Sequence, residues 1–246
     1  MDRMLYIAMT GAKQTMLAQA ANSNNLANAN TTAFRADLAA FRSMPVYGPG
    51  EPSRVYAMAE RSGVDLRQGV ITSTGNDMDV AVKGDGWIAV QAPDGSEAYT
   101  RAGNLRVEQG GLLVTGSGLP VLGEGGPIAI PQAVKADIGA DGTISIQASG
   151  QSPSTLTVID RIKLVNPDLA SMSKGKDGLM RVGDGSVAAA DASVQLVSGA
   201  LETSNVNTVE AMANMIALAR QYEAQVKIMK EAGDMETKSN DLLSMS

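Results

Sequence analysis

The sequence predicts an α+β protein in which N- and C-terminal helical segments form a coiled pair and flank a central all-β domain, a sandwich or an irregular barrel. Two observations support this class. Apolar residues recur at helical spacing near both ends of the 246-residue chain, and short apolar runs alternate with turn residues between them. The expected domains are a helical segment at 1–42, a loop or linker at 43–63, a β domain at 64–198 and a second helical segment at 199–246.

The N-terminal segment is predicted to be a helix with a narrow apolar stripe, followed by an asparagine-rich break. Asparagine favours caps and turns because its amide competes for backbone hydrogen bonds. The helix should therefore end near residues 28–32, with Phe34 as an apolar anchor beyond it. We expect the amides of Asn25 and Asn28 to cap this bend and bridge to a neighbouring helix, or simply to face water. The stripe consists of Leu5, Met9, Ala12, Met16, Gln19 and Leu26.

The central region is predicted to be β structure that follows a Pro- and Gly-rich loop at 45–52. Asp-Gly and Gly-Gly pairs separate the apolar runs, as expected of turns between short strands. Trp87, the only tryptophan, should anchor the core at the start of a strand, and residues 99–101 should pack and pair within this domain. The expected strands are 80–82, 87–90, 112–114, 128–130, 144–146 and 156–165.

The C-terminal segment is predicted to be a second long helix. Asn205 or Asn207 is its expected N-cap, because asparagine oxygens accept hydrogen bonds from the free N–H groups of a first turn. Its apolar residues fit a heptad pattern with a polar break at Glu236. They are Met212, Met215, Ala219, Tyr222, Val226, Met229, Gly233 and Leu243.

Two narrow stripes make a poor core alone, because helices in proteins gain most of their stability from tertiary packing. One interpretation is that both helices pack on the β domain of their own chain. The other is that they pack on further copies or on homologous chains, which would produce a tube of helices with β domains outside. The pattern leaves both open, since Met-rich stripes are common in ordinary cores as well as in recognition surfaces.

The composition excludes several classes of function. The chain has no Cys and no His, so no thiol nucleophile, zinc finger or Ser-His-Asp triad is expected, and we predict no catalytic, cofactor or metal residue. A net charge of −6 argues against nucleic-acid binding. An enzyme would have to use carboxylates such as Asp77 with Asp79, or Asp94, Asp141 and Asp184, but the last three precede Gly and are typical of turns. The apolar run at 4–9 is too short for a secretory or membrane-spanning segment.

Three stretches, in this order along the chain, resemble the rod and hook family of the bacterial flagellum. Residues 24–35 (NNLANANTTAFR) resemble the N-terminal signature, and residues 198–207 (SGALETSNVN) with the helix through 220–223 resemble the C-terminal signature. Between them, residues 78–82, 84–87 and 99–103 are similar to the family's β module.

This resemblance implies a structural subunit of the basal-body rod, the drive shaft that crosses the periplasm, assembled through its terminal helices and needed for motility. It implies export by the flagellar type III apparatus without a cleaved signal, and as partners other proximal and distal rod proteins and copies of itself, with no nucleic acid, small-molecule substrate or cofactor. The expected assembly residues are Leu5, Met9, Ala12, Met16, Asn25, Leu26, Asn28, Phe34, Asn205, Val206, Asn207, Met212, Met215, Ala219, Tyr222, Val226, Met229 and Leu243.

Two positions depart from the family pattern. Ala33 stands where the family usually has Gly before Phe, and Ala would be strained if the backbone there needs a positive φ. Residues 210–213 (EAMA) replace the usual Glu-Met-Val and thin the apolar stripe. The chain most resembles the proximal-rod member. The alternatives are a distal rod or hook subunit, or a β-rich extracellular binding or adhesion module whose helices are linkers.

Overall fold

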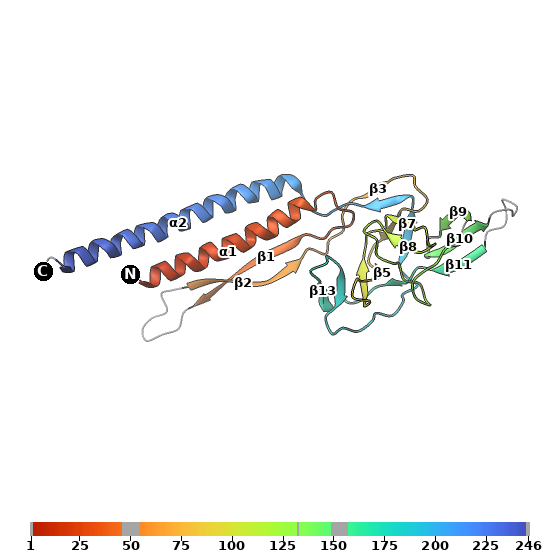
Figure 1. Cartoon of the computed structure of the whole chain (residues 1–246), viewed down its shortest axis with the longest axis horizontal. Coiled ribbons are helices and arrows are strands. Elements are labelled where there is room, and N and C mark those ends of the chain that lie inside the picture. The colour runs from red at the N-terminus through yellow and green to blue at the C-terminus, as the bar shows by residue number, and fades with distance from the viewer. Residues whose placement is uncertain (1, 46–54, 132, 149–156, 245–246) are drawn as a thin grey trace. The chain divides into compact units, whose positions relative to one another are not determined.

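The computed structural model describes residues 2–45, 55–131, 133–148 and 157–244, and these form two compact units (Figure 1). The helical unit comprises Met1–Ala29, Ala36–Asp65 and Val206–Ser246, and the β unit comprises Asn30–Arg35 and Leu66–Asn205. The predicted α+β class is confirmed: two helices, one near each end, flank a β-rich centre. The strands of the described ranges form small separate sheets and no closed barrel.

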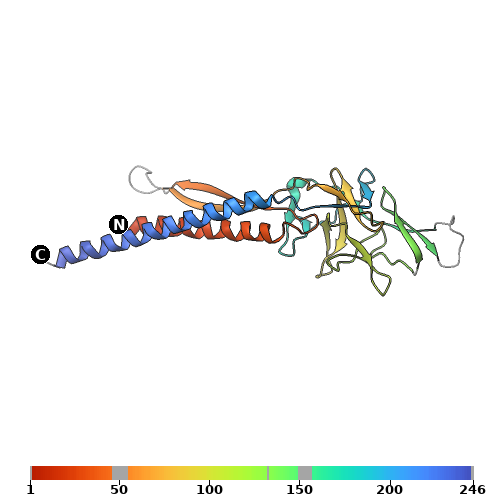
Figure 2. The same cartoon turned by 90° about the horizontal axis from the view of Figure 1, so that it is seen from above.

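The helical unit consists of two antiparallel helices and a β-hairpin. Helix α1 (Asp2–Ala27) lies beside α2 (Thr208–Ser244) in both views, and the longer α2 extends past the N-terminus of α1 (Figures 1 and 2). Strands β1 (Asp37–Pro45) and β2 (Val55–Val64) pair in antiparallel register, and Figure 1 shows the hairpin running alongside α1.

This hairpin replaces part of the predicted N-terminal helix and linker. The first helix ends at Ala27, in agreement with the asparagine signal, but residues 37–45 are a strand and not a continuation of helical structure up to residue 42. Strand β2 likewise occupies most of the second half of the expected linker at 43–63, and most of the Pro-rich loop at 45–52 lies outside the described residues. A helix cannot continue through Ala33, whose φ of +56° is left-handed.

The β unit contains short strands in several sheets. Its largest sheet has the order β12-β5-β6-β14-β13, a three-stranded sheet has the order β11-β10-β9, and the pairs β15-β4, β16-β3 and β7-β8 complete it. The strands are β3 (Ile71–Ser73), β4 (Val80–Lys83), β5 (Trp87–Gln91), β6 (Glu97–Thr100), β7 (Leu105–Val107), β8 (Leu113–Thr115), β9 (Ala133–Ile138), β10 (Thr143–Ala148), β11 (Thr157–Arg161), β12 (Leu164–Val165), β13 (Met172–Lys174), β14 (Met180–Val182), β15 (Gln195–Ser198) and β16 (Ala200–Glu202), with a short 3₁₀ helix at Leu169–Ser171.

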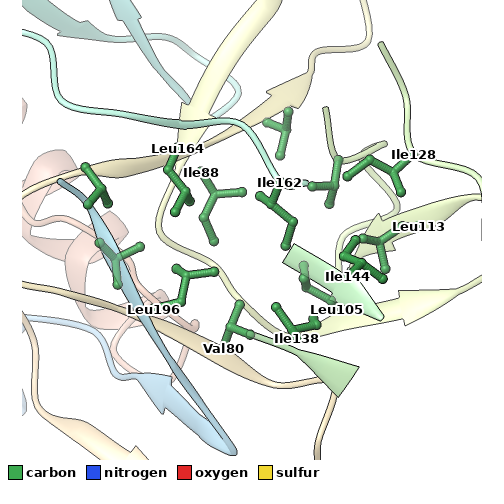
Figure 3. Close-up of a cluster of buried hydrophobic side chains, with 14 of the residues drawn as sticks. Val80, Ile88, Leu105, Leu113, Ile128, Ile138, Ile144, Ile162, Leu164 and Leu196 are labelled. Carbon is green, nitrogen blue, oxygen red and sulfur yellow. The ribbon is translucent and has the colours of Figure 1, made fainter. Parts of the chain in front are cut away.

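Aliphatic side chains from most of these strands form one core (Figure 3). Figure 3 shows Ile88, Leu164 and Ile162 near one another, with Val80 and Leu196 on a second side and Leu113 with Ile144 on a third. Residues 128–130 form no regular strand, but they are bonded as β structure: Ala129 forms an isolated bridge with Leu112, and Ile128 donates to Val121 and accepts from Leu113 through the backbone. Ile128 is fully buried in the core, so the apolar run marks burial as well as β-type pairing.

Candidate assembly interface

The α1 side of the contact between the two helices consists of small side chains. The buried residues on α1 recur every three or four positions, which places them on one face of the helix. The amide of Asn22 donates to the carbonyl oxygen of Ala211 on α2 at 2.7 Å, and Ala211 is itself buried. The predicted pairing of the terminal segments therefore occurs, but through a partly different set of residues. The buried residues on α1 are Ala8, Ala12, Thr15 and Ala18.

The α2 side of this seam differs from the predicted stripe. Ala211 and Gln225 lie on the seam, whereas the predicted neighbours Met212 and Val226 are exposed. The hydroxyl of Thr15 on α1 lies 3.3 Å from the Oε1 atom of Gln225, which confirms that this position contacts α1. The sequence-based prediction chose Met212 over Ala211 and Val226 over Gln225, because in each pair of neighbours it favoured the larger apolar residue. The half-buried residues of α2 include Gln225 itself, Ala232 and Leu218, none of which was predicted, and the predicted Met215, Ala219, Tyr222, Met229 and Gly233.

Three predicted apolar residues that lie off the seam, together with Ile216, which was not predicted, form an exposed surface that we call the open face. It is made of Met9 and Met16 on α1 and Met212 and Ile216 on α2. Their exposed fractions are 48%, 57%, 54% and 58% in chain order. On each helix the two open-face residues are turned about the helix axis by roughly 100–140° from the seam residues, in the direction in which the chain winds, because successive residues are about 100° apart. Because the helices are antiparallel, equal rotations place both pairs on the same side of the helix pair.

The other predicted assembly residues have varied environments. Ala12 is buried in the seam, and Val226 is exposed beside the open face. Asn207 caps α2: its Oδ1 atom accepts hydrogen bonds from the N–H groups of Val209 and Glu210, as predicted for one of the two candidate caps. The side chain of Leu243 lies outside the described residues. Half-buried residues are Leu5, Asn25, Leu26, Asn28, Phe34, Asn205, Val206, Met215, Ala219, Tyr222 and Met229.

Asn25 is engaged within its own chain. Its Nδ2 atom donates to the carbonyl oxygen of Asp37 at 2.8 Å, and its Oδ1 atom accepts from the N–H of Asp37 at 2.8 Å. Asn28 donates to the carbonyl oxygen of Asn24, one turn earlier. The structure therefore places both amides on backbone groups of the same subunit, and Asn25 ties the start of β1 to the end of α1.

Replacing Asn25 by Ala is expected to lower the free energy of unfolding by about 1–3 kcal/mol, because both hydrogen bonds to Asp37 are lost in a half-buried setting. Urea unfolding followed by far-ultraviolet circular dichroism measures this change. Asn24→Ala is the matched control, since the Asn24 side chain is exposed. Equal stability of the two variants would contradict the role assigned to Asn25.

A buried ionic cluster lies within the β unit around the carboxylate of Glu202. The Oε2 atom of Glu202 accepts from Nε of Arg101 at 2.8 Å, and Oε1 accepts from the backbone N–H of Gly69 at 2.9 Å. Arg101 also donates from Nη2 to the carbonyl oxygens of Val82 and Gly84. Burial lowers the pKa of Arg101, while the charge of Glu202 opposes that shift.

Arg35 is the second cation of this cluster. Its Nη1 atom lies 2.6 Å from Oε1 of Glu202, at ion-pair distance, but without the geometry of a hydrogen bond. The guanidinium groups of Arg35 and Arg101 lie 5.8 and 5.7 Å from the centroid of the Trp87 ring, close enough for cation–π attraction. Trp87 is the first residue of β5 and is buried, so the prediction of a core anchor is confirmed.

Of the carboxylates considered for catalysis, Asp77 pairs with Lys135, Asp79 accepts a hydrogen bond from Thr74, and the other three form turns. Oδ1 of Asp94 accepts from the N–H of Ser96, and Asp141 and Asp184 accept in the same way from Thr143 and Ser186. These hydrogen bonds, chiefly those from the side chains two positions on, lower the pKa of each Asp. Among the described residues no group of three or more acidic side chains could hold a metal ion. No described helix is both long enough and apolar enough to span a membrane.

Comparison with known proteins identifies the family. Residues 5–35 match the model of the flagella basal body rod protein, 81–146 that of the flagellar hook protein FlgE/F/G D1 domain, and 197–242 that of the flagellar basal body rod FlgEFG protein C-terminal region. The flagellar basal-body rod proteins FlgF of Escherichia coli K12 and of Salmonella typhimurium LT2 are each 44% identical over the full length of both chains. The chain belongs to the flagellar basal-body rod protein family.

Membership of the rod family assigns the protein a structural role in the flagellar basal body. The flagellar basal-body rod protein FlgG of Bacillus subtilis is also similar, at 31% identity over 96% of this chain and 97% of its own. Each of the three matched segments contributes to the ionic cluster: Arg35 lies in the first, Trp87 and Arg101 in the second, and Glu202 in the third. Residues far apart in the sequence are thus joined at one buried carboxylate.

Proposed function

We propose that this rod-family chain assembles through its terminal helices into the helical tube of the basal-body rod, the drive shaft that crosses the periplasm. The open face carries this proposal. Four large apolar side chains on one side of a helix pair have no covering element among the described residues of the helical unit, and their burial against neighbours would supply the main driving force for association.

The partners that fit this face are the helices of adjacent subunits. Assembly by one face meeting a different face of the next subunit produces an open helical polymer, which is what a rod requires. We propose that the neighbours are further copies of this chain and the homologous proximal and distal rod proteins. The role needs no cofactor, nucleic acid or small-molecule substrate, and we propose no enzymatic activity.

A position in the proximal rod is supported by the relatives. The FlgF proteins of Escherichia coli and Salmonella typhimurium share 44% identity with the full chain, compared with 31% for the Bacillus subtilis protein named FlgG, and a distal rod or hook subunit is the second candidate. We further propose that the chain reaches the periplasm through the flagellar type III export apparatus without a cleaved signal. The adhesion-module alternative lacks support, since the family matches include both terminal segments.

The small side chains on the α1 side of the seam also suggest that the helices of a free subunit are less stable than in the rod. Alanine side chains bury little apolar area, so packing between α1 and α2 alone contributes little to their stability. We propose that full ordering accompanies assembly, which would limit premature association of subunits.

Electron microscopy of basal bodies from cells that lack this chain tests the proposed function. We expect a rod that is absent or stops short, together with loss of swimming, and restoration of both by the full-length chain. A complete rod and normal swimming in the deletion strain would contradict the proposal. A chain without residues 2–29 and 206–244 should keep its β unit and fail to restore the rod, because both helices are then missing.

A further inference from the structure

Residues 30–35 combine several unfavourable features in one short segment of the β unit. Ala33 is the one non-glycine residue with positive φ among the described residues, and an L side chain is disfavoured in that conformation. Arg35 is 3% exposed, yet its Nε and Nη2 atoms make no hydrogen bond within the described structure, and its Nη1 atom contacts Glu202 as an ion pair without hydrogen-bond geometry. Buried donors without acceptors are costly, because they lose their bonds to water.

The electrostatic balance of the cluster adds to this cost. Two buried guanidinium groups face the single carboxylate of Glu202 within the cluster, so one positive charge is in excess there. Without Arg35, the remaining pair of Arg101 and Glu202 is neutral, and Glu202 keeps its hydrogen bonds from Arg101 and Gly69. The exposed carboxylate of Asp85 attracts the charge of Arg101. It accepts no hydrogen bond from the buried nitrogens of Arg35. Removal of the segment therefore leaves a complete ion pair behind.

Backbone hydrogen bonds and contacts of Lys174 hold the segment in place. The N–H of Ala33 donates to the carbonyl oxygen of Glu202 at 2.9 Å, and the N–H of Asn205 donates to that of Phe34 at 3.2 Å. Lys174 donates from Nζ to the carbonyl oxygen of Arg35 and lies 4.0 Å from the centroid of the Phe34 ring. Together with the contacts of Arg35 to Trp87 and to Glu202, these interactions oppose the backbone strain and the cost of the buried donors.

We propose that residues 30–35 form a releasable strap, which opens from the β unit as one segment while the rest of that unit stays folded. When the strap is closed, it packs against the ion pair of Glu202 and Arg101. When it is open, the guanidinium group of Arg35 can bind water or a carboxylate of a neighbouring molecule. Six released residues can span up to about 20 Å, so opening gives slack to the chain between α1 and β1. This inference concerns the single subunit and does not depend on its assembly.

Amide hydrogen exchange on the full-length chain tests the strap. The reporter is the amide of residue 33, and the references are the amides of Ala89 and Val121, which donate to Lys163 and Leu113 inside the core. We expect the Ala33 amide to be protected at least about 100-fold less than the references, as for an opening much cheaper than global unfolding. Equal protection at all three positions would overturn the proposal without any variant.

Two variants test the physical cause. Ala33→Gly removes the left-handed strain, and Arg35→Met removes the nitrogens that lack acceptors while keeping an apolar stem beside Trp87. Each should raise the protection factor of residue 33 by roughly 3- to 10-fold and leave Ala89 and Val121 unchanged, because only the strap equilibrium shifts. Arg106→Met, at an exposed site, is the control and should change neither. Lower protection of residue 33 in both variants would also overturn the proposal.

Discussion

Replacing Glu202 by Gln is expected to lower the free energy of unfolding of the β unit by about 3–5 kcal/mol, the cost typical of removing one partner from a buried ion pair. The substitution keeps the size of the side chain but leaves the guanidinium groups of Arg35 and Arg101 without the anion that they share. Because Trp87 is the only tryptophan and lies against both arginines, its fluorescence during urea unfolding measures this change directly.

The matched controls for Glu202→Gln separate charge balance from position. Glu108→Gln removes a carboxylate at an exposed site and should stay within about 0.5 kcal/mol of the natural protein. Arg35→Met should be far milder than Glu202→Gln, since it leaves the neutral pair of Arg101 and Glu202 intact. If Arg35→Met and Glu202→Gln lowered the free energy of unfolding equally, the cluster would depend on both cations alike, and the prediction would be contradicted.

The double substitution Met212→Lys with Ile216→Lys is expected to abolish assembly without unfolding the subunit. Both side chains are more than half exposed in the free chain, so stability should change by less than about 0.5 kcal/mol. In the rod, each would lose about 1.5–3 kcal/mol of apolar burial, which together weakens association by more than about 100-fold. Swimming in soft agar and the recovery of basal bodies measure the effect.

A second pair of lysines on the same helix provides the control. Ala217→Lys with Gln221→Lys adds the same charge, also one helical turn apart, at exposed positions on the opposite flank of α2. We expect this pair to retain clearly more assembly than the open-face pair. Equal loss of assembly in both would contradict the assignment of the open face, although it would leave the role of α2 intact.

The sequence predicted the features that are set locally. The asparagines after residue 21 mark the end of α1, and Asn207 caps α2, because caps depend on neighbouring backbone groups. The turns at Asp94 and Asp141 also follow from their own residues and the next two. The rod assignment came from the family resemblance, which the comparisons confirm at the level of a rod protein.

Features that depend on distant partners were not predicted. The hairpin β1–β2 was missed because neither strand shows a clean alternation of apolar and polar residues, and Asn25 fixes its start through tertiary hydrogen bonds. The α1 side of the seam was partly misplaced because Met9 and Met16 are larger and more apolar than Ala8 and Thr15, while close helix contact favours the smaller set. Nothing local to Arg35 or Glu202 indicates that the two meet across more than half of the chain.

Site-specific thiol labelling tests the central claim, that the open face of the helix pair is buried between subunits of the rod. The chain has no cysteine, so Met16→Cys and Ile216→Cys each introduce a single reporter at an exposed position. We predict rapid labelling in the free subunit and strong protection in isolated basal bodies, with an unfolded sample as the measure of full reaction. Labelling of both positions at the same rate in free subunits and in basal bodies that contain the variant would contradict the account.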